Sequence, residues 1–146
     1  MTSVNKHILV VGSGSAGKRH ARNLASRGCT ISSMDPRQDR LAELAEETPV
    51  ERGFDSIEAA LENSERLDGV VIASPPFFHV DQAIAAIEAK FPVLLEKPVS
   101  PDATSARKLA RTCESHEVPL LLGYTWRWWP PLRDVKTKLD SGVVGR

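Results

Sequence analysis

The sequence predicts an α/β fold built on a doubly wound parallel sheet. Short apolar runs alternate with longer segments whose apolar residues recur at the helical period. The runs are almost continuously apolar, which is typical of parallel strands that helices cover on both faces. Strand and helix alternate five or six times along 146 residues, a length that suits a single domain.

Six apolar runs are the predicted strands, and segments of helical period lie between them. The strands are expected at residues 7–11, 29–34, 49–54, 69–73, 92–96 and 119–124, of which 49–54 is the weakest. The helices are expected at residues 16–28, 37–47, 79–90 and 100–116, each with an apolar stripe opposite charged residues. Gly28 is placed to end a helix, and Ser100–Pro101 reads as an N-cap followed by proline at the first helical position.

The composition excludes several classes of protein. Lys+Arg and Asp+Glu number 19 each, so a formal net charge of zero gives no electrostatic case for nucleic acid or an anionic membrane. No apolar run approaches the ~18 residues of a membrane span, and a cytoplasmic location is expected. Cys29 and Cys113 are far apart in sequence and have no metal-type spacing, so reduced thiols and no metal site are expected.

A glycine motif joins the first predicted strand to the first predicted helix. Gly12, Gly14 and Gly17 have the spacing G-x-G-x-x-G in "VVGSGSAGKRH". In dinucleotide sites the first glycine allows a tight turn, the second lets the pyrophosphate approach the backbone, and the third allows close helix–strand packing. The helix N-terminus supplies free N–H groups for the phosphates. The alternative is a glycine-rich turn that binds nothing.

Asp35 supports the dinucleotide interpretation. It ends the second predicted strand, 18 residues after Gly17, where an acidic side chain can accept both hydroxyls of an adenosine ribose. Such a carboxylate would repel a 2′-phosphate, so NAD(H) is favoured over NADP(H). Arg37 and Arg40 lie close by and weaken that preference. A second interpretation leaves Asp35 as a helix cap before Pro36.

Two further loops follow predicted strands and lie at the same edge of the sheet, where open α/β sheets bind ligands. In "ASPPFFH", Ser74–Pro75 forms a rigid wall, and His79 either lines the site or serves as a hydrogen-bonding or packing residue at a helix start. In "LLEKPV", Lys97 is a compact cation that could hold a substrate oxygen. The alternative is that Glu96 and Lys97 form a surface ion pair before a turn.

Taken together, "GSGSAGKRH", Asp35, "ASPPFFH", "EKP" and "YTWRWWP" resemble, in order and spacing, the Gfo/Idh/MocA oxidoreductase family. The resemblance covers nearly the whole chain and implies a Rossmann fold that binds NAD, with NADP less favoured. It implies hydride transfer to or from a sugar, inositol or related alcohol or ketone, with Lys97 as the catalytic-site lysine. A cis bond before Pro98 occurs in such relatives. The residues expected at the cofactor are Gly12, Ser13, Gly14, Ser15, Ala16, Gly17, Asp35, Arg37, Ser74, Pro75, His79, Glu96, Lys97 and Arg127.

The sequence departs from the family pattern in two respects. Pro76 stands where the family often has asparagine, and the chain ends about where a second α/β domain begins in the family. Residues 1–123 are therefore expected to form the dinucleotide-binding domain, and 124–146 the start of the connection toward a second domain. That domain commonly supplies a histidine partner for the lysine, for which His79 and His116 are poorly placed.

The aromatic segment "YTWRWWP" leaves two structural alternatives. Trp126, Trp128 and Trp129 either pack on the Rossmann body or form a surface for self-association or a partner chain. Two other functions stay open besides the oxidoreductase half: a stand-alone nucleotide-binding module without turnover, and a degenerate domain for another nucleotide or a nucleotide-sugar.

Overall fold

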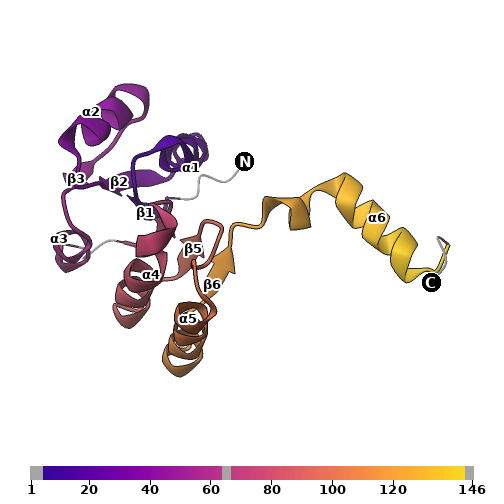
Figure 1. Cartoon of the computed structure of the whole chain (residues 1–146). Coiled ribbons are helices and arrows are strands. Elements are labelled where there is room, and N and C mark those ends of the chain that lie inside the picture. The colour runs from indigo at the N-terminus through magenta and orange to yellow at the C-terminus, as the bar shows by residue number, and fades with distance from the viewer. Residues whose placement is uncertain (1–4, 64–66, 144–146) are drawn as a thin grey trace.

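The computed structural model describes residues 5–63 and 67–143, and its centre is a six-stranded parallel sheet (Figure 1). The strand order is β3-β2-β1-β4-β5-β6, the doubly wound order in which the crossover falls between β1 and β4. The strands are β1 (His7–Val11), β2 (Thr30–Met34), β3 (Arg52–Phe54), β4 (Gly69–Ile72), β5 (Val93–Leu95) and β6 (Leu120–Leu122). All six predicted strands are therefore present, and the predicted fold class is confirmed.

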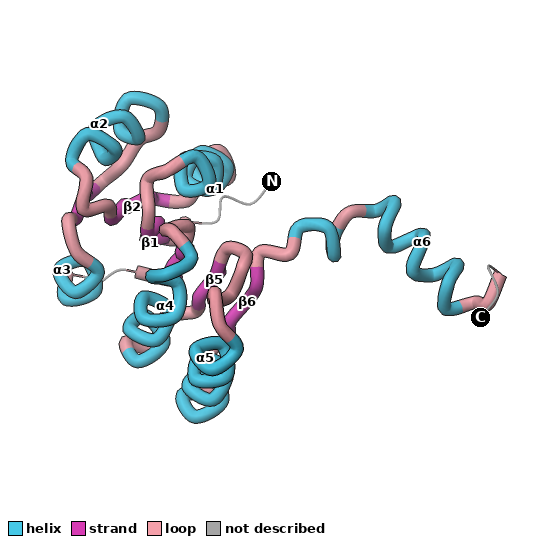
Figure 2. The backbone as a smooth tube through the Cα atoms, in the orientation of Figure 1, coloured by secondary structure: helices cyan, strands magenta, loops and turns pink. Residues whose placement is uncertain are grey.

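Helices cover both faces of the sheet, as the continuous apolar strands predicted (Figure 2). The helices are α1 (Ser15–Ala25), α2 (Gln38–Glu47), α3 (Ile57–Glu62), α4 (His79–Glu88), α5 (Ala103–His116) and α6 (Pro130–Asp140), with short 3₁₀ turns η1 (Pro76–Phe78) and η2 (Thr125–Trp128). On one face, Val10 of β1 packs with Ala21 of α1 and Leu44 of α2. On the other face, Leu9 belongs to the same cluster as Leu109 of α5. Alternate residues of β1 thus supply two separate cores.

The helix ends agree with the sequence at one position and differ at another. Gly28 has φ +86° in the turn after α1, and its N–H donates to Ala25 O at 2.9 Å, as expected for a helix-ending glycine. The prediction that Ser100 caps the helix expected at residues 100–116 is wrong. Asp102 is the N-cap, because its carboxylate accepts the Ser105 N–H at 2.8 Å, and α5 begins only at Ala103.

The segment after β6 lies apart from the sheet. Figure 1 shows η2 and α6 extending away from the body of the fold. Trp126, Trp128 and Trp129 are 66%, 59% and 48% exposed, and the edge-to-face contact of Trp126 with Trp129 lies within the segment itself. The alternative in which the tryptophans pack on the Rossmann body is therefore wrong.

Membrane-spanning helices and metal-binding clusters were sought in residues 5–63 and 67–143. Within these ranges no helix is both long and apolar enough to cross a membrane. The same ranges hold no cluster of three or more side chains that could bind a metal ion. Cys29 and Cys113 are free thiols.

Candidate functional site

A cavity of about 460 Å³ opens at the carboxyl edge of the sheet. Its walls come from the glycine loop, the end of β2, the start of α3 and the loop after β4. The residues that line it are Gly12, Gly14, Ser15, Ala16, Met34, Asp35, Pro36, Arg37, Arg40, Asp55, Ser56, Ile57, Glu58, Ala73, Ser74, Pro75, Phe78 and Gln82. The cavity thus lies at the crossover of the sheet, where doubly wound folds bind ligands.

The three glycines of the motif differ in what surrounds them. A Cβ on Gly17 would lie 1.7 Å from Gly12 O, so the third glycine lets α1 approach the first strand. Gly12 has φ +93°, and its Cβ would lie 2.7 Å from the backbone N of Ser74. A Cβ on Gly14 would meet only Arg40 Nη1, at 3.9 Å. Packing requires the first and third glycines, whereas Gly14 leaves open space above the N-terminus of α1.

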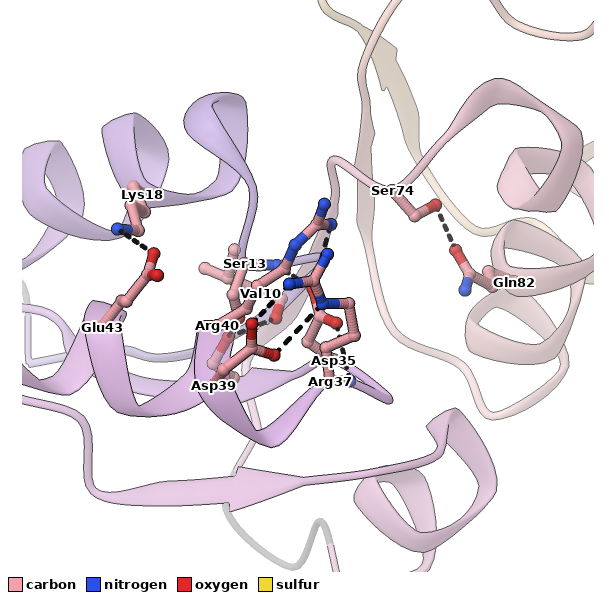
Figure 3. A network of polar contacts seen from close by, with 11 residues as sticks. Val10, Ser13, Lys18, Asp35, Arg37, Asp39, Arg40, Glu43, Ser74 and Gln82 are labelled. Atoms are coloured by element: carbon pink, nitrogen blue, oxygen red, sulfur yellow. Dashed lines mark hydrogen bonds and ion pairs between the residues drawn. The ribbon is translucent and has the colours of Figure 1, made fainter.

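The N-terminus of α1 presents backbone donors at this open space. The backbone hydrogen bond that begins the helix joins Lys18 N–H to Gly14 O at 2.9 Å. The N–H groups of the residues before Lys18 have no carbonyl acceptor within the helix, as at every helix N-terminus. Together with the helix dipole they favour an anion such as a pyrophosphate. The Lys18 ammonium does not face this space: it bonds Glu43 of α2 at 3.0 Å (Figure 3). It also bonds Glu47 at 2.9 Å.

Asp35 is 3% exposed and connects the glycine loop to the end of β2 (Figure 3). Its Oδ2 accepts the Ser13 N–H at 2.8 Å, and its Oδ1 accepts the Arg37 N–H at 3.0 Å. The second N–H belongs to Arg37, which is itself the N-cap of α2, so the interpretation of Asp35 as a helix cap is wrong. Each carboxylate oxygen can accept more than one hydrogen bond, so Asp35 keeps acceptor capacity on the cavity side.

The two arginines near Asp35 are placed differently. The Arg37 guanidinium is bound to the Asp39 carboxylate, with Nε 3.1 Å from Oδ1 (Figure 3). Arg40 Nη1 lies 3.9 Å from Asp35 Oδ2 on the cavity wall. Asp35 therefore has Arg40 as its ion-pair neighbour, whereas Asp39 binds the Arg37 guanidinium.

His79 is 1% exposed and connects the loops that follow β4 and β5. Its Nε2 lies 2.8 Å from Ser74 O and its Nδ1 lies 2.7 Å from Pro98 O. A neutral imidazole carries a single N–H and can donate to one of these oxygens, whereas an imidazolium donates to both. The ring stands behind the cavity wall, as the hydrogen-bonding interpretation expects. Ser74 stays on the wall, and its Oγ donates to Gln82 Oε1 at 2.6 Å.

Glu96 is buried and contacts α1, so the interpretation of Glu96 and Lys97 as a surface ion pair is wrong. Its Oε1 accepts from His20 Nε2 at 2.8 Å and from Arg19 Nη2 at 3.2 Å. Its Oε2 accepts the Lys97 backbone N–H at 3.2 Å. Burial alone would raise the pKa of Glu96, but the hydrogen bonds from His20 and the Lys97 amide, with the nearby cations, hold the pKa below its usual value.

Lys97 stands at the same edge of the sheet but outside the cavity lining. Its side chain is exposed, and within the described part of the chain its ammonium has no hydrogen-bond or ion-pair partner. The Lys97–Pro98 peptide bond is cis, as the family resemblance suggested. Arg127 is exposed in η2 and borders a groove with α6. Contacts of Lys97 and Arg127 with a ligand stay predictions.

The structure brings together some of the residues that the sequence analysis expected at the cofactor. Eight of those residues line the cavity, namely Gly12, Gly14, Ser15, Ala16, Asp35, Arg37, Ser74 and Pro75. Ser13, Gly17, His79, Glu96, Lys97 and Arg127 do not line it.

Sequence reasoning missed the wall at residues 55–58. The sequence "DSIEAALE" carries a signal for this wall, because Ser56 caps α3 by accepting the Ala59 N–H at 3.3 Å. The helix has six residues, too few to show a helical period. The strand at β3 was predicted, but the turn after its carboxyl end was not recognised as part of the site.

These features fit a dinucleotide. The open space at Gly14 and the donors of α1 suit a pyrophosphate, and the buried carboxylate of Asp35 suits a ribose diol.

Comparisons with known proteins agree with this fit. The model of an oxidoreductase family with an NAD-binding Rossmann fold (GFO_IDH_MocA) matches residues 6–124. An inositol 2-dehydrogenase of Corynebacterium glutamicum is 32% identical over 147 aligned positions, which cover 98% of this chain and 43% of the relative. A D-apiose dehydrogenase of Rhizobium rhizogenes is 29% identical, over 99% of this chain and 42% of the relative.

Solved structures resemble the fold closely. The scyllo-inositol dehydrogenase of Lactobacillus casei, with bound NAD(H) and scyllo-inositol, aligns with a TM-score of 0.88 at 27% identity, over 97% of this chain and 42% of that one. The chain thus spans less than half the length of these relatives. Because the family model matches most of the chain, the protein belongs to the Gfo/Idh/MocA oxidoreductase family, and residues 6–124 are its NAD-binding Rossmann fold.

Proposed function

We propose that the chain binds NAD(H) in the cavity as the dinucleotide-binding half of a dehydrogenase that acts on a polyol or sugar. The observation that carries the proposal is the open space at Gly14, above the donors of α1 and beside the buried Asp35 carboxylate. The backbone of residues 14–16 would hold the pyrophosphate, and Asp35 the adenosine ribose. Ser74 and Pro75 would border the nicotinamide half. When bound, the nicotinamide ring gives or accepts a hydride.

Lys97 is proposed to act on the substrate. The Lys97 ammonium has no partner among residues 5–63 and 67–143 and stands at the carboxyl edge of β5, so it can donate a hydrogen bond to an alcohol or carbonyl oxygen. It can stabilise negative charge on that oxygen and exchange a proton with it. The substrate class follows from relatives whose names specify inositol or apiose. Both the substrate and the activity belong to the proposal.

The cofactor preference is proposed to be NAD(H) over NADP(H). Asp35 faces the position of the ribose, and a phosphate there would meet a buried negative charge. Two arginines could offset that charge. Arg37 is held by Asp39, whereas Arg40 lies 3.9 Å from Asp35 and weakens the preference without reversing it. We expect NADH to bind at least about tenfold more tightly than NADPH, the equivalent of about 1.4 kcal/mol. Isothermal titration of the purified chain with each dinucleotide measures the difference.

Asp39→Ala is the companion variant for this titration. It releases Arg37 without removing a cavity-lining residue, so NADPH affinity should rise while NADH affinity stays constant. Equal affinity of the wild-type chain for NADPH and NADH would contradict the preference. Failure to bind either dinucleotide would contradict the proposed function.

A turnover assay tests whether the chain is a complete enzyme or only the dinucleotide-binding half of one. We expect the 146 residues alone to form no NADH from NAD⁺ with inositols or sugars at an enzymatic rate, because they span only 43% of the length of the inositol 2-dehydrogenase that they match. Absorbance at the dihydronicotinamide band tests this. Normal turnover would contradict the expectation.

The aromatic segment is proposed to bind a second copy of the chain or a partner protein. Exposed apolar side chains continue from η2 along α6, through Leu132, Val135 and Leu139. We expect concentration-dependent association, or binding of an apolar dye, measurable by light scattering and fluorescence. A monodisperse monomer that binds no dye would contradict it.

A further inference from the structure

We infer that His20, with Arg19, positions Lys97 through the buried Glu96 carboxylate, so that α1 holds both the dinucleotide loop and the lysine. The inference rests on the proposed function of Lys97 but adds residues that the family resemblance did not assign. Arg19 and His20 follow the first turn of α1, and neither lines the cavity. They are positioning residues, because they act through another side chain.

The first step concerns the backbone at Glu96. Its N–H donates to Ile72 O at 2.9 Å, which extends the pairing of β5 with β4 by one residue. Its side chain then turns to α1, where Oε1 accepts from His20 Nε2 at 2.8 Å. The other oxygen, Oε2, accepts the Lys97 N–H at 3.2 Å. The Glu96 carboxylate therefore links the His20 side chain of α1 to the backbone N–H of Lys97.

The second step concerns Lys97 itself. Its ammonium has no partner among the described residues, so the protein holds Lys97 only through its backbone. One backbone restraint is the amide bond to Glu96, and the other is His79 at Pro98 O, 2.7 Å away. A change in the Glu96 carboxylate should therefore move the lysine.

The third step distinguishes His20 from Arg19. The His20 side chain is 20% exposed, whereas that of Arg19 is 54% exposed and its contact with Glu96 is longer, at 3.2 Å. Exposed ion pairs contribute little, because water competes for both groups. On the far side of the carboxylate, a Cβ on Gly123 would lie 3.4 Å from Oε2, so the strand end of β6 closes the site. His20 is therefore the principal partner.

The consequence is a mechanical link between two parts of the site. His20 stands six residues after Gly14, the N-cap of α1, which is about 9 Å along the helix axis. A helix is rigid over that length, so the pyrophosphate donors at one end and the lysine tether further along keep a fixed spacing.

The experiment observes Lys97 directly. The lysines of the whole chain are converted to ¹³C-dimethyl-lysine, and the Lys97 signal is assigned by its loss in Lys97→Arg. We expect His20→Ala to shift and broaden the Lys97 signal in the free chain. His20→Gln, whose amide N–H can still donate to Glu96, should restore the wild-type position. Lys18→Ala is the matched control, because it removes bonds to Glu43 and Glu47 from a position two residues before His20 without touching Glu96.

The outcomes separate this inference from the proposed function. An unchanged Lys97 signal in His20→Ala, with the circular dichroism of the wild type, would overturn the inference. So would an equal change in Lys18→Ala. Should His20→Ala fail to fold, Glu96→Gln provides the second test, and it must displace the Lys97 signal for the inference to stand. A wild-type chain that binds no NADH would contradict only the proposed function, since the spectra of the free chain decide the role of His20.

Discussion

Replacing Gly14 with valine should reduce NADH affinity at least about 100-fold, the equivalent of about 2.7 kcal/mol, while leaving the fold intact. A Cβ at this position meets no protein atom closer than 3.9 Å, so the protein has room for the side chain. The added methyl groups would occupy the space in which the pyrophosphate approaches the backbone. Gly14 also has φ −73°, which any residue adopts, and the free energy of unfolding should change by less than about 1 kcal/mol.

Gly17→Ala is the matched control and should show the opposite pattern. Its Cβ would lie 1.7 Å from Gly12 O, so α1 must move away from the first strand and stability is lost. Calorimetric titration and chemical denaturation measured on both variants separate the two glycines. Wild-type NADH affinity in Gly14→Val would contradict the placement of the pyrophosphate.

Replacing Asp35 with alanine should lower both NADH affinity and stability. The variant loses the acceptor for the ribose and leaves the N–H groups of Ser13 and Arg37 without the carboxylate. Hydrogen bonds to a charged group contribute about 1.5–3 kcal/mol each, so the loss of two predicts a fall of about 3–6 kcal/mol in the free energy of unfolding. NADH affinity should fall at least about tenfold, or about 1.4 kcal/mol. Asp35→Arg is a poorer test of cofactor preference, because the site is buried.

Asp68→Ala provides the control for Asp35→Ala. Asp68 also accepts a backbone N–H, from His7 at 2.9 Å, and it pairs with Lys6 at the opposite edge of the sheet. Its removal should lower stability without changing NADH affinity. Denaturation curves and titrations of both variants are compared, and equal NADH affinity in the two would contradict the role of Asp35 at the ribose.

The sheet was predictable because its strands are continuous apolar runs that must be buried. Val70, Val71 and Ile72 of β4 are all buried, and such a run has few alternatives to a central parallel strand. Short elements carried too little periodicity, which is why α3 was missed. At Ser100 the choice of cap lay between Ser100 and Asp102, two residue types that cap helices about equally well, and the structure uses the Asp102 carboxylate. The local sequence "SPDATS" contains both possible N-cap residues and does not show which of them caps the helix.

The site was predictable where its residues are close in sequence and not where they meet across the fold. The glycine motif is local, and the structure gives Gly12 and Gly17 the packing roles expected of them. Glu96 and His20 are 76 residues apart, and no pattern in the sequence pairs them. The interpretation of Glu96 as a partner of Lys97 followed from adjacency alone, whereas burial directs the carboxylate toward α1.

The most direct test of the account is a crystal structure of the chain with NADH. The account predicts the pyrophosphate at the backbone of residues 14–16, the adenosine ribose on Asp35, and the nicotinamide directed past Ser74 toward the edge at which Lys97 stands. A dinucleotide bound outside this cavity, or bound with its ribose away from Asp35, would contradict the central claim.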